Sequence, residues 1–219
     1  NLVGVSHECD FPLNVRGLPV VTSSVIPKDA TSADIDRLVR EHLSKFKALY
    51  QLDLDLLREL QPDVIVTQAL CDVCAVSAED VEAVVDELPS RPTVINLEPM
   101  SLEDLFMTTL EVGRVAGVEQ HALARVDDFR RRISAVEARR PADIEDYPRV
   151  VFLEWVDPPF NAGHWTPELI AMAGGHDCLG DAGKASTTLS WEDIVAAQPD
   201  VLCIACCGFS AKRSFEDLQ

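Results

Sequence analysis

The 219-residue chain carries 37 acidic and 19 basic side chains, and its net charge of −18 argues against nucleic acids and anionic membrane surfaces as partners. Hydrophobic residues make up 47% of the chain, which is enough to fill one large core or two small ones and argues against a disordered chain. No apolar run reaches the roughly 20 residues that a membrane-spanning helix needs.

The first hundred residues alternate short apolar runs with helical patterns. Short runs rich in β-branched residues predict strands at 2–6, 63–67 and 93–97. An apolar period of 3.6 residues predicts helices at 33–43, 54–60 and 78–88, capped by Ser32, Asp53 and Ser77. Such alternation is typical of parallel sheets covered by helices.

Residues 101–140 carry two helical patterns and no strand pattern. The first helix begins after Ser101 and ends at Gly117. The second spans 119–139, about 31 Å at the rise of an α-helix. Its apolar stripe consists of Ala122, Val126, Phe129, Ile133 and Val136. We expect this long helix to connect two lobes.

Strand and helix patterns alternate again after residue 148. Strands are predicted at 149–155 and 200–205, and helices after the capping residues Thr166 and Ser190. The expected fold class is therefore α/β, with two lobes of mainly parallel sheets joined by a long rigid helix. The predicted division is an N-terminal lobe at 1–100, linking helices at 101–140 and a C-terminal lobe at 141–219, with both ends of the chain expected to be truncated.

A short motif recurs at equivalent places in the two predicted lobes. QPDV at 61–64 returns at 198–201, each time between a short acidic helix and an apolar strand. The matched context favours duplicated lobes over chance. The same spacing relates Asp55 to Glu192, and both fall in the first turn of a predicted helix, where the helix dipole favours a carboxylate.

The seven cysteines favour free thiols, because their number is odd and the chain is large enough not to need disulfide bonds. Cys71 and Cys74, like Cys203 and Cys206, have the spacing of half a zinc site, but the two pairs lie too far apart for a zinc ribbon. Most of the cysteines are expected to be small buried apolar residues. We predict no catalytic residues, no cofactor and no metal site.

The segments that follow the predicted strands hold the side chains best suited to contact a ligand. In open α/β sheets, ligands bind beyond the carboxyl ends of the strands. Aromatic, histidine and cysteine side chains there suit a broad, partly apolar ligand with some polar groups. The predicted ligand-binding residues are His7, Cys9, Gln68, Cys71, Trp155, Phe160, His164, Trp165, Cys207 and Phe209. For the aromatic residues, core packing is the alternative.

These segments resemble the solute-binding proteins of ABC importers for cobalamin, haem and iron–siderophore complexes, most closely the cobalamin-binding branch. The resemblance covers nearly the whole chain. It rests on GVSHECDFP at 4–12, LQPDVIVTQALCDVCAVS at 60–77, FLEWVDPPFNAGHWTPEL at 152–169, and SWEDI with QPDVL within 190–202. The SHECD, LCDVC and GHW loops differ from those of the best-known cobalamin binder, which indicates a cysteine-rich subgroup.

The resemblance implies a ligand cleft between two lobes, and a corrinoid or a related metal chelate as the ligand. A cobalt corrinoid can take His7 or His164 as an axial ligand. It also implies a monomer that binds no nucleic acid and docks on an ABC permease. In the resembled proteins an acidic residue on each lobe pairs with permease arginines, and Glu192 and the shorter Asp55 occupy the matching places.

The rival hypothesis is a cytoplasmic thiol-dependent enzyme, or a cytoplasmic metal-chelate carrier. Such an enzyme would pair His7 with Cys9 or His164 with Cys207, or use Cys71 or Cys74. Import requires a periplasmic or membrane-anchored extracellular location, whereas the cysteine content leaves a cytoplasmic location open.

Overall fold

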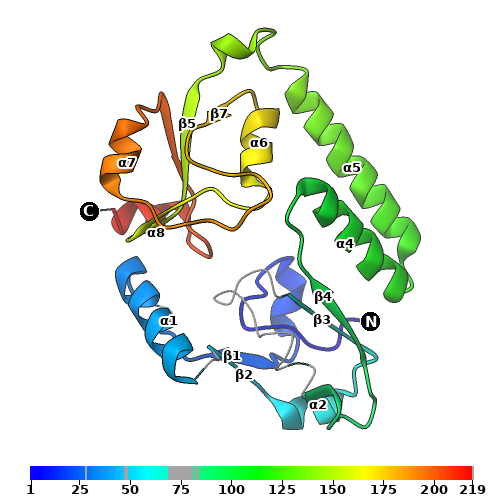
Figure 1. The fold of residues 1–219 in the computed structure, drawn as a ribbon. Helices are drawn as coiled ribbons and strands as arrows, with labels where there is room; N and C mark the ends of the chain where they lie inside the picture. The colour runs from blue at the N-terminus through cyan, green and yellow to red at the C-terminus, as the bar shows by residue number, and fades with distance from the viewer. Residues whose placement is uncertain (28, 47–48, 69–80, 82–83, 219) are drawn as a thin grey trace. The chain divides into compact units, whose positions relative to one another are not determined.

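The computed structural model describes residues 1–27, 29–46, 49–68, 81 and 84–218 (Figure 1). The chain forms two compact units. The first consists of Asn1–Ala30 and Arg37–Glu98, and the second of Thr31–Asp36 and Pro99–Gln219. The chain therefore enters the second unit twice, first at the start of a helix and again after Glu98.

The first unit holds two small sheets. Strand β1 (Thr22–Ser24) pairs with β2 (Tyr50–Leu52) in antiparallel orientation, and β3 (Val64–Gln68) pairs with β4 (Thr93–Leu97) in parallel orientation. The remaining elements are the 3-10 helix η1 (Leu13–Gly17), helix α2 (Leu54–Leu60) and most of helix α1 (Ser32–Phe46). The predicted strands at 63–67 and 93–97 and the helix at 54–60 are thus confirmed.

The second unit is built around strand β5 (Arg149–Val156), which pairs with three other strands. Strands β7 (His176–Asp177) and β8 (Val201–Ile204) are parallel to it, and β6 (Pro159–Asn161) is antiparallel. The other elements are α4 (Leu102–Val115), α5 (Glu119–Glu137), η2 (Ile144–Asp146), α6 (Thr166–Met172), α7 (Trp191–Ala196) and α8 (Ala211–Glu216). The predicted α/β class is confirmed, with short antiparallel strands added to the parallel pairs.

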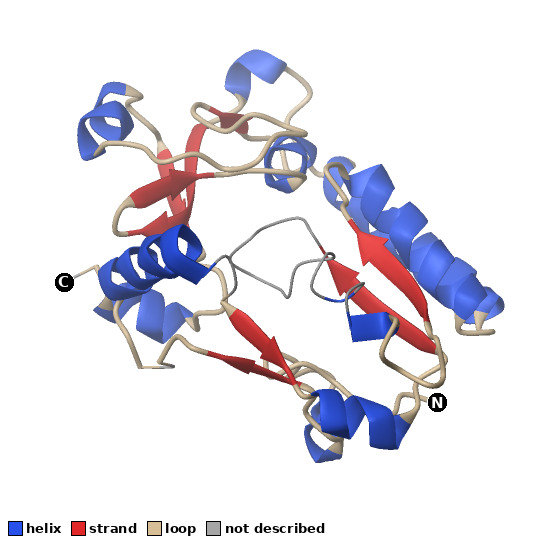
Figure 2. Cartoon of the chain, turned by 60° about the horizontal axis from the view of Figure 1, so that its bottom comes forward, coloured by secondary structure: helices blue, strands red, loops and turns tan. Residues whose placement is uncertain are grey.

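Alternate residues of β5 are buried on the two faces of its sheet. Val151 and Leu153 are fully buried and pack with Ile194 of α7. Val150 points to the other face, where a Cβ at Gly175 would meet both its side chain and that of Ile170 in α6 at 2.9 Å. Helices therefore cover both faces of this sheet (Figure 2), which is the arrangement that a continuous apolar run predicts.

Helices α4 and α5 approach each other through small residues. Leu102, Phe106 and Val126 form the buried centre of their shared cluster. A Cβ at Gly113 would overlap the Cβ of Ala122, so the close approach of the two helices depends on glycine at this position. The helical character predicted for 101–140 is confirmed over both helices.

The QPDV motif occupies the same local structure in both units. Asp53 and Ser190 cap α2 and α7, each accepting a hydrogen bond from the backbone amide three residues later. Gln61 and Gln198 follow with φ angles of 44° and 46°, in the left-handed region, and lead into β3 and β8. The two segments therefore share helix, turn and strand, which supports the predicted duplication.

The predicted strand at 2–6 is wrong. Val5 alone makes an isolated parallel bridge to Val20. Its amide donates to the Pro19 carbonyl, and its carbonyl accepts from Val21. Proline has no amide hydrogen, so Pro19 cannot extend the ladder as a donor. Of the predicted helix at 78–88, residues 78–80, 82 and 83 lie outside the described residues, and Val81, Val84 and Val85 are helical.

Two predicted helix caps are also wrong. Ser32 lies inside α1, and the Thr31 hydroxyl accepts the hydrogen bond from the Asp34 amide instead. Thr166 lies inside α6, and its hydroxyl bonds to the Glu154 carboxylate at 3.2 Å. At Ser32 the cap moves by one residue to Thr31, whereas a carboxylate twelve residues earlier in the sequence takes the Thr166 hydroxyl. Among the described residues, no helix has both the length and the apolar character needed to cross a membrane.

Replacing Gly113 by alanine is expected to destabilise the second unit. The added methyl group overlaps Ala122, and overpacking costs about 1–3 kcal/mol, which outweighs the roughly 1 kcal/mol that alanine gains over glycine within a helix. Urea unfolding followed by circular dichroism should show a lower midpoint. Gly17→Ala is the control, because a Cβ there meets no atom within 4 Å. Unchanged stability of Gly113→Ala would contradict the close helix contact.

Candidate functional site

An aromatic pair lies at the carboxyl edge of the β5 sheet. The ring centroids of Trp155, near the end of β5, and Phe209, after β8, are 4.9 Å apart, with their planes inclined by 51°. The Arg213 guanidinium lies 3.6 Å from the centroid of the Phe209 ring. We call these three side chains the Trp155 cluster. Because β5 and β8 are parallel, their carboxyl ends meet at this edge, where open α/β sheets bind ligands.

Buried backbone groups hold the indole of Trp155 in place. Its Nε1 donates a hydrogen bond to the Ser32 carbonyl oxygen at 3.2 Å, and the Ser32 amide donates to the Asp217 carboxylate at 2.8 Å. Ser32 is only 2% exposed. The start of α1 and the end of α8 therefore fix the orientation of the aromatic pair from within the same unit.

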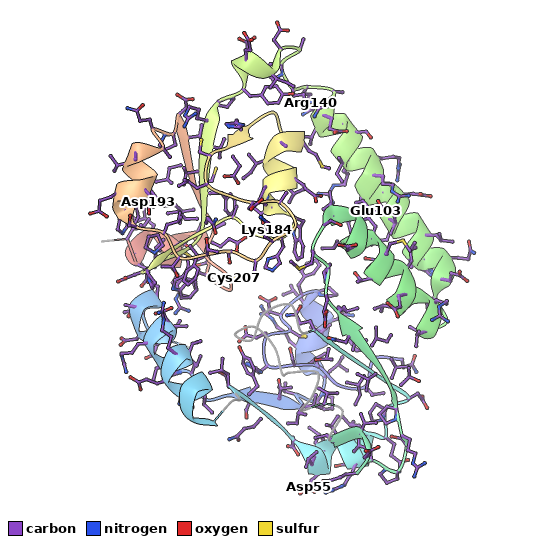
Figure 3. The ribbon with its side chains drawn as sticks, in the orientation of Figure 1. Asp55, Glu103, Arg140, Lys184, Asp193 and Cys207 are labelled. Atoms are coloured by element: carbon purple, nitrogen blue, oxygen red, sulfur yellow. The ribbon has the colours of Figure 1, made fainter. Side chains whose placement is uncertain are left out.

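Two adjacent cysteines follow β8. Cys206 is buried, and this burial raises the pKa of its thiol, although a hydrogen bond with Ser214 acts in the opposite direction. Cys207, labelled in Figure 3, is exposed, and its backbone amide donates to the Glu154 carbonyl at 3.1 Å. Because the thiolate is the nucleophile, the raised pKa makes Cys206 a poor one at neutral pH.

The loop after β6 is anchored by the side chain of Glu154. Its Oε1 accepts hydrogen bonds from the Gly163 amide at 2.9 Å and from the Thr166 hydroxyl at 3.2 Å. His164 follows with a φ of 53°, and its amide donates to the Lys184 carbonyl at 2.6 Å. The His164 Nε2 is buried and has no hydrogen-bond partner among the described residues. These hydrogen bonds therefore hold the main chain of the loop at His164.

Phe160 and Trp165 belong to the framework around this loop. Phe160 lies opposite Trp155 in the β5–β6 pair and also bridges to Thr188. Trp165 packs against the buried cluster of α4 and α5, and its ring lies 5.9 Å from that of His164. Both aromatic side chains are half-buried, so each combines core contacts with an accessible edge.

His7 is the best-anchored of the predicted ligand residues in the first unit. Its Nδ1 lies 2.6 Å from the Thr22 hydroxyl oxygen, which also accepts a hydrogen bond from the His7 amide. Its Nε2 lies 3.3 Å from a carboxylate oxygen of Glu8, and its ring centroid lies 5.1 Å from that of Tyr50. A hydroxyl on Nδ1 fixes the orientation of the ring.

The other predicted residues of the first unit are less constrained. Cys9 is exposed, with its sulfur 3.3 Å from the Ser6 hydroxyl. Gln68 is half-buried at the end of β3. Cys71 and Cys74 lie outside the described residues.

The structure unites part of the predicted set and adds residues that sequence reasoning missed. Trp155, Phe160 and Phe209 come together, and Arg213 and Glu154 were not predicted. Glu154 carried a signal, since it is the acidic residue in the apolar run of β5, whereas nothing in the sequence pairs Arg213 with Phe209. In the described ranges, His, Cys, Asp and Glu side chains form no group of three that could hold a metal ion.

The two acidic residues predicted to dock on a permease both lie in the first turn of a helix. Asp55 of α2 is 3.1 Å from Arg58. Glu192 of α7 is exposed beside Asp193, whose pKa is lowered by hydrogen bonds from Ser190 (Figure 3 labels Asp55 and Asp193). The helix dipole favours a carboxylate at such positions without any partner.

One family model matches most of this chain. Its description is "Periplasmic binding protein", and the match covers residues 15–219. The chain belongs to the periplasmic binding protein family. Membership confirms the resemblance that the sequence motifs indicated, and the family is one of binding proteins. No curated protein matches the chain.

Solved structures of periplasmic binding proteins share the fold of this member of the family. The heme-binding protein RhuT from Roseiflexus sp. RS-1 is 24% identical with a TM-score of 0.62, and 92% of this chain aligns with 67% of RhuT. A heme-binding protein from Pseudomonas aeruginosa is 19% identical, with a TM-score of 0.65 and coverages of 99% and 68%. The vitamin B12 binding protein BtuF of Vibrio cholerae is 17% identical, with a TM-score of 0.60 and coverages of 93% and 67%.

We expect iodoacetamide to modify Cys207 at least roughly tenfold faster than Cys206 at pH 7. Burial raises the pKa of Cys206, so little of it is thiolate at this pH, and its rate should rise as the pH approaches that pKa. Timed labelling with site-resolved mass spectrometry measures both rates. The exposed Cys9 serves as the control for Cys207. Equal rates at the two adjacent cysteines would contradict the burial of Cys206.

Proposed function

We propose that this periplasmic binding protein is the solute-binding component of an ABC-type importer and binds a corrinoid or a related metal chelate such as haem or an iron–siderophore. The observation that carries the proposal is the Trp155 cluster at the carboxyl edge of the β5 sheet. The faces of Trp155 and Phe209 suit a large, partly apolar ring system, and the Arg213 guanidinium suits carboxylate or amide groups at its periphery. The vitamin B12 and heme binders that share the fold support this ligand class.

The remaining predicted residues are part of the same proposal. His7 and His164 are the imidazoles proposed to contact the ligand or its metal, and the hydrogen bond at Nδ1 of His7 suits a contact through Nε2. Cys9, Gln68, Cys71, Phe160, Trp165 and Cys207 are proposed as further contacts. We propose no catalytic step.

The proposed importer role also assigns a location and a partner. The protein acts as a monomer outside the cytoplasmic membrane and delivers its ligand to a permease. Asp55 and Glu192 are proposed to pair with arginines of that permease. Their exposure supports this role, since the side chain of Asp55 is 96% exposed although it lies near Arg58.

Titration of the protein with cobinamide, cobalamin, haem and ferric siderophores, followed by absorbance and tryptophan emission, tests the ligand class. We expect one of them to bind, and Phe209→Ala to weaken its binding by roughly tenfold through the lost ring contact. Phe215→Ala is the matched control, because Phe215 is 64% exposed on α8. Absence of binding for all four ligands at tens of micromolar would refute the proposed function.

Transport assays in vesicles with the cognate permease test the docking residues. Glu192→Gln should keep the ligand affinity and lower the transport rate, because the exposed carboxylate acts only on the permease. The fold should lose little stability, about 1 kcal/mol or less. Glu119→Gln is the control, since Glu119 is also an acidic residue in the first turn of a helix. Normal transport by Glu192→Gln would contradict the docking role and leave Glu192 as a carboxylate that interacts only with the helix dipole.

A further inference from the structure

Helices α4, α5 and α6 of the second unit border an apolar groove that contains none of the proposed ligand residues. Its volume is about 320 Å³. Phe129, Ile133 and Val136 of α5 form one wall, and Leu169 and Met172 of α6 form the other. Val136 is 47% exposed and Leu169 is 41% exposed, so apolar surface that could be covered remains in contact with water.

A row of arginines runs along the α5 side of this groove. Arg125 and Arg132 are spaced by seven residues, which returns a helix to nearly the same face after two turns, and Arg139 follows beyond the end of α5. Arg132 lines the groove itself, and Arg139 lies in the turn directly after α5. All three are exposed, and Arg125 and Arg132 lie about 10 Å apart along the helix axis.

The guanidinium groups of this arginine row are unpaired among the described residues, because nearby carboxylates serve other partners. Asp128 pairs with Arg131 at 3.0 Å, and Glu137 pairs with Arg140 at 3.6 Å. On the facing helices, Glu103 pairs with Arg130 at 2.7 Å and Glu168 accepts from the Leu102 amide at 3.0 Å. In a chain with a net charge of −18, a row of three cations without carboxylate partners is a local departure from the overall charge.

We propose that the groove and the arginine row form a docking surface for an amphipathic helix of a partner protein. The apolar face of that helix fills the groove, and acidic residues repeated along one edge pair with Arg125, Arg132 and Arg139. Charges spaced by seven residues suit a helical partner, because Arg125 and Arg132 lie about 10 Å apart on one line along α5 and Arg139 follows just beyond its end. A single small anion reaches only one or two of these arginines.

Charge and shape favour a helix over a membrane surface. A partner helix bound in the groove interacts only with the groove and with charged groups of the protein within a Debye length, about 10 Å. An anionic bilayer faces the whole acidic protein and is repelled by it. The surface is also concave, which suits a convex helix better than a flat bilayer.

A synthetic 18-residue amphipathic helix tests the proposal with the full chain. One peptide carries leucines on one face and glutamates at heptad spacing beside them, and a second peptide carries lysines in place of the glutamates. Fluorescence anisotropy at 50 mM and 300 mM salt measures both affinities. We expect the acidic peptide to bind at least about tenfold more tightly than the basic one, and this preference to shrink at high salt.

Matched variants locate the binding surface. Arg132→Glu and Leu169→Asp should each weaken the acidic peptide by about fivefold or more. Arg131→Glu and Leu123→Asp are the controls and should leave its affinity unchanged. Arg131 is exposed on another face of α5, and Leu123 is 40% exposed, close to the value for Leu169. Circular dichroism of each variant checks that the helices remain intact.

The outcomes separate cleanly. Preference for the acidic peptide together with losses confined to Arg132→Glu and Leu169→Asp supports the proposal. Equal binding of both peptides, binding that the variants do not change, or no binding up to 500 µM (roughly −4.5 kcal/mol) overturns it. Binding to vesicles of anionic phosphatidylglycerol that depends on Arg132, without peptide binding, overturns it in favour of a membrane surface.

Discussion

Pairing along strand β5 determines where the functional side chains of the second unit lie. Val151 and Leu153 are fully buried, and β6, β7 and β8 all pair with this strand. This pairing fixes the positions of the carboxylate and the backbone carbonyl of Glu154, near the end of the strand. Glu154 anchors the loop of His164 through its carboxylate and receives the Cys207 amide at its carbonyl. A shift of β5 by one residue would point Glu154 toward the buried apolar face of the sheet. The loop of His164 and the segment of Cys207, which Glu154 binds, would then move with it.

The Trp155 cluster illustrates how distant segments cooperate in one unit. The indole comes from β5, its hydrogen-bond acceptor from the first turn of α1, and its ring partner from the segment after β8. Ser32 contributes through its backbone alone, since its amide and carbonyl bind Asp217 and Trp155. A buried serine with both backbone groups engaged is therefore a structural support for the proposed binding surface.

Charge is distributed unevenly over this acidic chain. Carboxylates stand at helix N-termini, where Asp104 and Asp193 complete capping boxes and the hydrogen bonds from Ser101 and Ser190 lower their pKa values. This stabilisation is present at neutral pH and is lost as the pH falls through the lowered pKa values. Arginines gather instead between 125 and 140, beside apolar surface. The proposed ligand site, permease contacts and helix-docking surface thus use chemically different parts of the protein.

Local sequence patterns determined the elements that depend on neighbouring residues. Period and capping chemistry predicted α2, α4, α5 and α7, because a cap such as Ser101 or Ser190 binds an amide only three residues away. The sequence motifs likewise indicated the family, since they include the loops that follow the strands. Tertiary structure alone decided the rest. Short strands such as β6 have too few residues for a pattern, and the Thr166 hydroxyl, expected to cap a helix, bonds to Glu154 instead. The contact between Arg213 and Phe209 was likewise not predicted, because contacts of this kind follow from packing and are not encoded in local sequence spacing.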